Sequence, residues 1–422
     1  MTLGNRFRRM YAATAASDLS DGIGRTALPL AAAAYTRDPL AVSGLVTFAF
    51  LPWLLFALPS GALVDRVDRR VAMAGANVVR AAASGTLAVV VLAHAGGIAV
   101  LYAVSFALGM AETVYDSAVR ALLPQVVPTA ELDRANSLLT VEETLGQTFL
   151  GAPIGAALYG VALALPFALN SLGFVLAVVL ILTVRGGYRP VRAAQPRSVR
   201  HDIRDGVRWL RAHGLLRGLT LISAAQSGTQ SMVTGVFVLY VLEVLGLSSG
   251  RFGLVFLVAG AGAILGGVAT PPLARRFGRL IVLSVGSAFS AVMTGLMAFT
   301  HNGAVGATLF ALSAAGVMTW NVLTMSMRQA LIPQHLFGRV QGAYRTLVWG
   351  AIPVGSLLGG ALASWLGIRW VFAVAGAISV VLAVVLARLL GRHRALLGDV
   401  PDTEPDPVRP ASAAAPLSPG AP

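Results

Sequence analysis

Long apolar stretches constrain what this chain can fold into more than any other feature of its sequence. Each is close to the roughly 20 residues that an α-helix needs to cross the hydrocarbon core of a bilayer. Twelve can be marked, at residues 11–35, 40–64, 71–94, 97–122, 137–163, 166–185, 218–243, 252–274, 280–300, 303–327, 340–366 and 370–391. Hydrophobic residues make up 56% of the 422 and charged residues only 12%, whereas about a quarter of a soluble protein is charged. The sequence therefore predicts an all-α membrane protein with twelve transmembrane helices.

An internal repeat groups these stretches into two sets of six. The segment Arg120–Leu138, which precedes the fifth stretch, has a counterpart at Arg328–Gly342, and Pro124 of the first corresponds to Pro333 of the second. A repeat near half the chain length is typical of transporters built from two related halves, with the substrate site between them. We expect an N-terminal half at 1–185, a cytoplasmic amphipathic linker at 186–217, a C-terminal half at 218–394 and a disordered cytoplasmic tail at 395–422.

The basic residues predict how the chain is oriented. All 32 are arginine, and arginines near helix ends accumulate on the cytoplasmic side of a membrane. With the N-terminus inside, only Arg37, Arg251 and Arg369 fall in outer loops. We therefore expect the protein to lie in the plasma membrane with both termini in the cytoplasm. The net charge of +14 follows from this topology and from anionic lipid, so no nucleic-acid partner is expected.

Residue types that carry enzyme chemistry are sparse. The chain has no cysteine, and its six histidines are scattered without a metal-ligand or nucleophile motif. We expect neither an enzyme nor a bound metal or cofactor. The acids that follow the basic N-terminus favour a retained first helix, with a cleaved signal peptide as the alternative.

A ten-residue polar loop, GALVDRVDRR at Gly61–Arg70, separates the second and third stretches. Lipid cannot accept this loop, so it must lie in water at one membrane face. Its pattern resembles the signature loop of the major facilitator superfamily, and Asp68 at the place of a second glycine is similar to enterobactin-exporter and macrolide-efflux relatives. The matching residues are Gly61, Leu63, Asp65, Arg66, Arg69 and Arg70. The resemblance implies a monomeric transporter that works by alternating access, in which the loop and Asp116 form a conformational latch and Asp65 meets the start of the eleventh helix.

Charges inside the predicted spans are the candidate site. Asp18, Asp21 and Arg25 share one face of the first helix, and Glu112 lies midway along the fourth. A charge at bilayer depth costs several kcal/mol unless it faces a bundle interior or water, so it indicates a functional site. The alternative is a structural ion pair between Asp21 and Arg25. Because helices 1 and 4 face the central cavity in the family that the chain resembles, we assign proton coupling to Asp21 and Glu112, then Asp18, and a cavity contact to Arg25.

Three further expectations concern pairs and motifs. Arg80 in the third helix needs an acid, for which we expect Glu142, and Asp116 is expected to pair with Arg69 or Arg70. The fifth helix resembles the glycine-proline motif of antiporters in this superfamily, which implies a gate; simple close packing is the alternative. The motif residues are Gly151, Pro153 and Gly155.

The second half lacks acids in its spans, and its polar residues are neutral. Gln226, Gln230 and Asn321 are the expected substrate contacts. The leading hypothesis is proton-coupled efflux of a small, fairly apolar molecule such as an antibiotic or siderophore-like metabolite. An importer or uniporter of the same fold, or a receptor or scaffold that no longer transports, are the alternatives.

Overall fold

The computed structural model describes residues 3–188 and 199–393, and these residues are almost entirely helical. The N-terminal helices are α1 (Asn5–Tyr35), α2 (Pro39–Val64), α3 (Arg69–Leu92), α4 (Ile98–Val126), α5 (Leu132–Glu143), α6 (Ala152–Val161) and α7 (Leu165–Leu182). The remaining helices are α8 (Val199–Ala212), α9 (Gly214–Leu239), α10 (Ser249–Phe277), α11 (Arg279–Leu296), α12 (Gly303–Leu331), α13 (Gln334–Leu366) and α14 (Ile368–Arg392). Short 3₁₀ turns lie at Thr129–Glu131 (η1) and Met297–Phe299 (η4), and π-helical segments at Thr144–Gly151 (η2) and Tyr240–Val244 (η3).

Within the described residues, nine helices are long and apolar enough to cross a membrane, namely α2, α3, α4, α7 and α10 to α14. The other three predicted spans coincide with α1, with the α5–η2–α6 stretch and with α9. In α1 and α9, charged or polar side chains lower the hydropathy. In the fifth span, the π-helical segment η2 divides the stretch into α5 and α6, which have only 12 and 10 residues. The predicted fold class, an all-α membrane protein of twelve transmembrane helices, is confirmed. The predicted tail and part of the linker lie outside the described residues.

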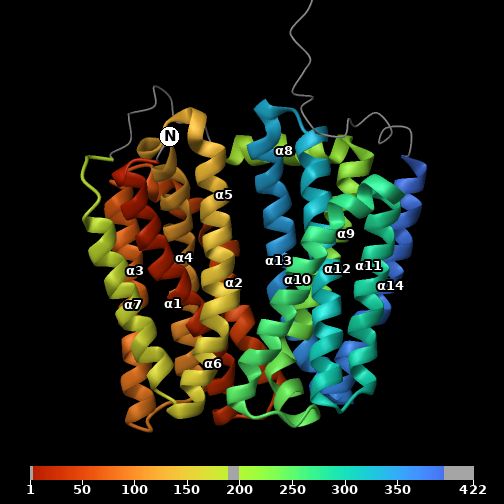
Figure 1. Cartoon of the computed structure of the whole chain (residues 1–422), viewed down its shortest axis with the longest axis horizontal. Helices are drawn as coiled ribbons and strands as arrows, with labels where there is room; N and C mark the ends of the chain where they lie inside the picture. The colour runs from red at the N-terminus through yellow and green to blue at the C-terminus, as the bar shows by residue number, and fades with distance from the viewer. Residues whose placement is uncertain (1–2, 189–198, 394–422) are drawn as a thin grey trace, which may run out of the picture.

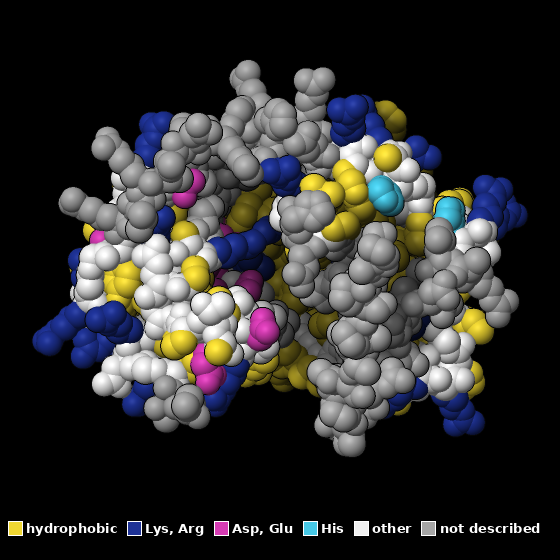
Figure 2. Space-filling view, turned by 90° about the horizontal axis from the view of Figure 1, so that it is seen from above, with side chains coloured by type: hydrophobic (Ala, Val, Ile, Leu, Met, Phe, Trp, Pro, Cys, Tyr) yellow, Lys and Arg dark blue, Asp and Glu magenta, His cyan; other side chains and the backbone are white. Residues whose placement is uncertain are grey.

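The helices form two bundles that lie side by side (Figure 1). Helices α1 to α7 make up one bundle and α9 to α14 the other, and α8 lies across one end of the second. The bundles touch mainly through α2 against α13 and α6 against α10. Seen from the end that carries the N-terminus, the surface is hollowed between the bundles, with arginine and acidic side chains beside the hollow (Figure 2). The molecule is therefore open at this face.

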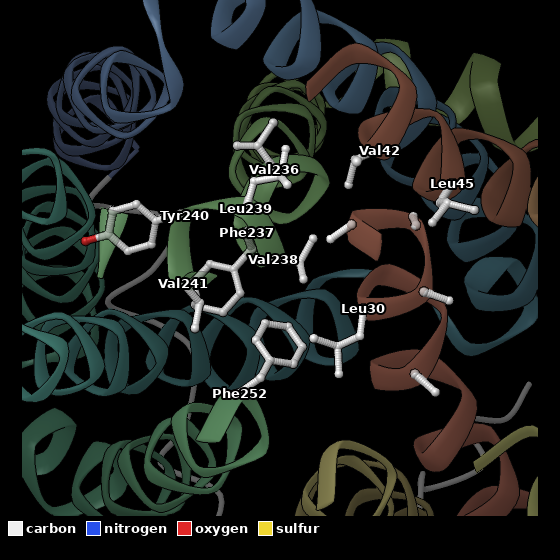
Figure 3. Close-up of a cluster of buried hydrophobic side chains, with 14 of the residues drawn as sticks. Leu30, Val42, Leu45, Val236, Phe237, Val238, Leu239, Tyr240, Val241 and Phe252 are labelled. Atoms are coloured by element: carbon white, nitrogen blue, oxygen red, sulfur yellow. The ribbon is translucent and has the colours of Figure 1, made fainter. Parts of the chain in front are cut away.

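An apolar cluster closes the opposite end. Leu30 and Val42 of the first bundle meet Val236, Phe237 and Phe252 of the second, and all five are buried (Figure 3). Side chains from both bundles thus exclude water from this end of the interface, which is where burial of apolar surface stabilises the contact between them.

Candidate functional site

Arg80 is the centre of a polar network inside the first bundle. Its side chain is 1% exposed. Its Nη1 donates to Ser17 Oγ at 3.0 Å and to Asp21 Oδ2 at 3.2 Å, and the guanidinium lies 4.7 Å from the ring centroid of Tyr115. The expected partner, Glu142, was wrong. Glu142 ends α5, which packs on α1 and α4, and α1 presents Asp21 directly to α3.

A second ion pair joins α1 to α4. Arg25 Nη2 lies 3.1 Å from Glu112 Oε1, and the two side chains are 55% and 25% exposed. Asp21 and Arg25 therefore each bind a partner on another helix, and the alternative ion pair between them does not form. Of the three acids assigned to proton coupling, Asp21 and Glu112 each pair with an arginine of another helix, whereas Asp18 accepts a hydrogen bond from Gln147.

The signature loop is held by the end of α7. Asp68 accepts hydrogen bonds from Arg70 N and Tyr188 N, both at 2.9 Å, and so caps the start of α3. Arg69 donates to the Tyr188 carbonyl and Arg70 to the Val184 carbonyl, each at 3.0 Å. The aspartate that departs from the usual glycine thus has a structural role.

The predicted pairing of Asp116 with the signature loop was wrong for this conformation. Asp116 Oδ2 accepts instead from Arg120 Nη2 at 3.0 Å, one turn along α4. Arg69 and Arg70 of the loop donate instead to carbonyls in the segment that follows α7. Asp65 ends α2 and is exposed.

The expected substrate contacts of the second half come together at one cavity. Gln226 and Gln230 of α9 and Asn321 of α12 line a space of about 310 Å³, together with Trp320 and Tyr344. Gln226 Nε2 also donates to Ser379 Oγ at 3.2 Å. The α2 side chains of Val46 and Phe50 complete the lining, so the cavity lies between the bundles. Arg25 does not line it.

The predicted gate motif lies between the two bundles. A Cβ atom at Gly151 would meet the backbone of Gly22, and one at Gly155 would meet the backbone of Ile23. Pro153 packs on Gly253 of α10. The glycines therefore allow α1 to approach closely, as the close-packing interpretation expects, while the proline contacts the other bundle.

Sequence reasoning missed an aromatic contact across the interface. The rings of Trp53 on α2 and Trp349 on α13 lie 4.4 Å apart edge to face, and the guanidinium of Arg345 lies 4.1 Å from the Trp349 ring centroid. Nothing in the local pattern pairs two tryptophans that are far apart in the chain. Only the repeat, which places α2 and α13 in opposite halves, could have indicated that they meet.

Comparison with known proteins matches this architecture. A family model described as Major Facilitator Superfamily covers residues 10–353. The chain belongs to the major facilitator superfamily. An uncharacterised transporter of this superfamily from Mycobacterium tuberculosis is 27% identical over 412 residues, which span 92% of this chain and 91% of that protein. Macrolide efflux protein A of Streptococcus pyogenes is 23% identical over 393 residues, 90% of this chain and 95% of the relative.

Solved structures of the superfamily share the fold. A variant of nucleoside transporter NupG superposes with a TM-score of 0.77 at 11% identity. The match covers 91% of this chain and 100% of the NupG chain. The superfamily fold places the protein in a membrane, with its helices crossing the bilayer.

Proposed function

We propose that this superfamily member is a proton-coupled exporter of a small, fairly apolar molecule. The observation that carries the proposal is the cavity between the bundles, whose second-half wall is polar but uncharged. Such a wall suits a ligand held by hydrogen bonds and apolar contact without a full charge of its own. The similarity to a macrolide efflux protein favours export and an antibiotic-like substrate.

Proton coupling is assigned to the two ion pairs of the first bundle. Asp21 with Arg80 and Glu112 with Arg25 each join two helices. Protonation of either acid would cancel its charge and loosen the contact, so proton binding and helix arrangement are linked. This assignment keeps the roles expected for Asp21 and Glu112. On the basis of the arginine distribution, we place the protein in the plasma membrane with its open face and both termini on the cytoplasmic side.

Transport into inverted membrane vesicles tests the proposal. Vesicles with an acidic lumen should accumulate a labelled macrolide or another member of a toxic-compound panel, and an ionophore that collapses the pH gradient should stop accumulation. Vesicles without the protein are the control. If accumulation of every transported compound is the same with and without the pH gradient, proton coupling is refuted. Transport out of the inverted vesicles would favour an importer.

A further inference from the structure

Glu142 is a buried acid that neither ion pair uses. It lies in the last turn of α5 and is 6% exposed. Among the described residues, neither of its carboxylate oxygens accepts a hydrogen bond. It faces Thr14 and Asp18 of α1, but the Thr14 hydroxyl donates to the Tyr11 carbonyl at 3.0 Å. A fully charged carboxylate without donors in such a place would be costly.

Asp18 of α1 is held by a hydrogen bond from the neighbouring π-helical segment. Its Oδ1 accepts a hydrogen bond of 2.9 Å from Gln147 Nε2 of the π-helical segment η2. The backbone of η2 is in close contact with α1, because a Cβ at Gly22 would meet the Gln147 carbonyl and one at Gly146 would lie 3.3 Å from Asp18 Cβ. Single π-helical turns are frequent at functional sites. Gln147 thus holds Asp18 in place beside Glu142.

Among the described residues, no arginine forms an ion pair with Asp18 or Glu142. Arg80 of α3 binds Asp21 and Ser17, and Arg25 of α1 binds Glu112. The other titratable groups that face the pair are Tyr11 and Asp21 on α1, Tyr115 on α4 and Glu143 on α5. None of these supplies a cation. Glu142 is buried and Asp18 is partly buried beside it, and two adjacent carboxyl groups without a paired cation are strongly unfavourable when both are ionised, so one keeps a proton.

We propose that Asp18 and Glu142 share one proton and form a proton-binding site between α1 and α5, separate from the two ion pairs. The shared proton supplies the missing donor to Glu142 and links α5 to α1. Its release leaves two negative charges side by side and drives the α5–η2 stretch away from α1. The site deepens the proposed proton coupling and rests on it for its role in transport, whereas proton binding itself needs no substrate.

Carbodiimide labelling tests the site directly. Dicyclohexylcarbodiimide reacts with protonated carboxyl groups in apolar surroundings, and peptide mass spectrometry identifies the modified residue. Full-length protein in lipid nanodiscs should be labelled at Glu142 or Asp18 at neutral pH, and labelling should fall as the pH rises. In Asp18→Asn, the amide can donate to an ionised Glu142, so labelling of Glu142 at neutral pH should fall by about tenfold. Glu131→Gln, which removes an acid paired with Arg134 at the helix surface, is the matched control and should leave labelling unchanged.

Infrared spectroscopy of the wild-type protein tests the shared proton even if a variant does not fold. The wild-type protein should show the carbonyl stretch of a protonated carboxylic acid at neutral pH, and Glu142→Gln or Asp18→Glu should remove or shift that band. Absence of both the band and the label, or labelling of Glu142 that is equal in wild type and Asp18→Asn, would overturn the shared proton. If the pair is labelled but vesicles show no proton-driven transport, the site stands and the coupling proposal fails.

Discussion

Arg80 is a buried guanidinium, so the protein is destabilised if Arg80 loses its acidic partner. Replacing Arg80 by Met strands Asp21, and loss of one member of a buried ion pair typically costs about 3–5 kcal/mol. The double variant with Asp21→Asn should regain most of this stability, which thermal unfolding in detergent would measure. Arg120→Gln breaks the exposed ion pair with Asp116, one turn away on α4, and should lower stability by about 0–1 kcal/mol. Additive losses in the cycle would contradict direct coupling.

Glu112 decides whether the proposed coupling is right. Glu112→Gln keeps the shape of the side chain and its hydrogen bond to Arg25 but cannot bind and release a proton. Substrate-dependent proton movement in proteoliposomes should be abolished, while binding of the same compound at equilibrium survives. Arg37→Gln, which removes an exposed ion pair with Glu243 that joins the two bundles at the closed end, leaves the proposed proton sites intact and should keep proton movement. Uphill transport by the Glu112→Gln protein would place the coupling group elsewhere.

At this scale the sequence predicted which charged residues form contacts between the helices better than it predicted their partners. Helical spacing and span position pointed to Asp21, Glu112 and Arg80, because charges at bilayer depth are costly wherever the chain folds. Their partners depend on which helices are neighbours. Arg80 was assigned to Glu142 since both are buried, but it is α1 that brings Ser17 and Asp21 within hydrogen-bond distance of Arg80.

Among the helices, the close contact of α1 with Gly151, where η2 joins α6, predicts a marked loss of stability on added volume. Gly151→Ala places a Cβ against the backbone of Gly22, where no flexible side chain can yield. Overpacking of this kind costs about 1–3 kcal/mol, and we expect lower thermal stability together with slower transport. Gly75→Ala on α3 meets nothing within 4 Å and is the matched control. Equal stability of the two variants would show that α1 and the end of η2 are not held this closely.

Helix positions were predictable from hydropathy, whereas the break in the fifth span was not. The apolar stretch at 137–163 reads as one helix, but it consists of α5, the π-helical η2 and α6. Pro153 has no N–H to donate, so a regular helix would lose a hydrogen bond one turn earlier. The proline indicates an irregularity there, while the form it takes depends on how closely α1 approaches.

For the molecule as a whole, two residues of the signature loop are expected to differ in role: Asp65 in transport and Asp68 in folding. Asp65 is exposed at the open face, where it would meet the start of α13 only after this face closes. Asp65→Asn should therefore slow transport and leave stability and ligand affinity unchanged. Asp68→Ala removes the cap of α3 and should cost about 1 kcal/mol of stability. Unchanged transport by Asp65→Asn would contradict the latch.

The arrangement of the halves followed from the repeat, but their state of opening did not. One sequence must specify both the open and the closed form of each face, so hydropathy and motifs are the same in all of them. The apolar cluster around Leu30 and Phe252 looks like ordinary core in the sequence, and only its place between the bundles shows that it closes one end.

The contact of Trp53 with Trp349 provides an optical signal of this motion. Indole rings 4.4 Å apart are close enough to couple electronically, and Arg345 beside them perturbs their emission. If α2 and α13 separate when the molecule opens at the other end, near-ultraviolet circular dichroism and intrinsic fluorescence should change as the pH gradient or a substrate shifts the population. Trp53→Phe should abolish the change, and Trp209→Phe, on α8, should not. Unlabelled protein would then report its own alternation in real time.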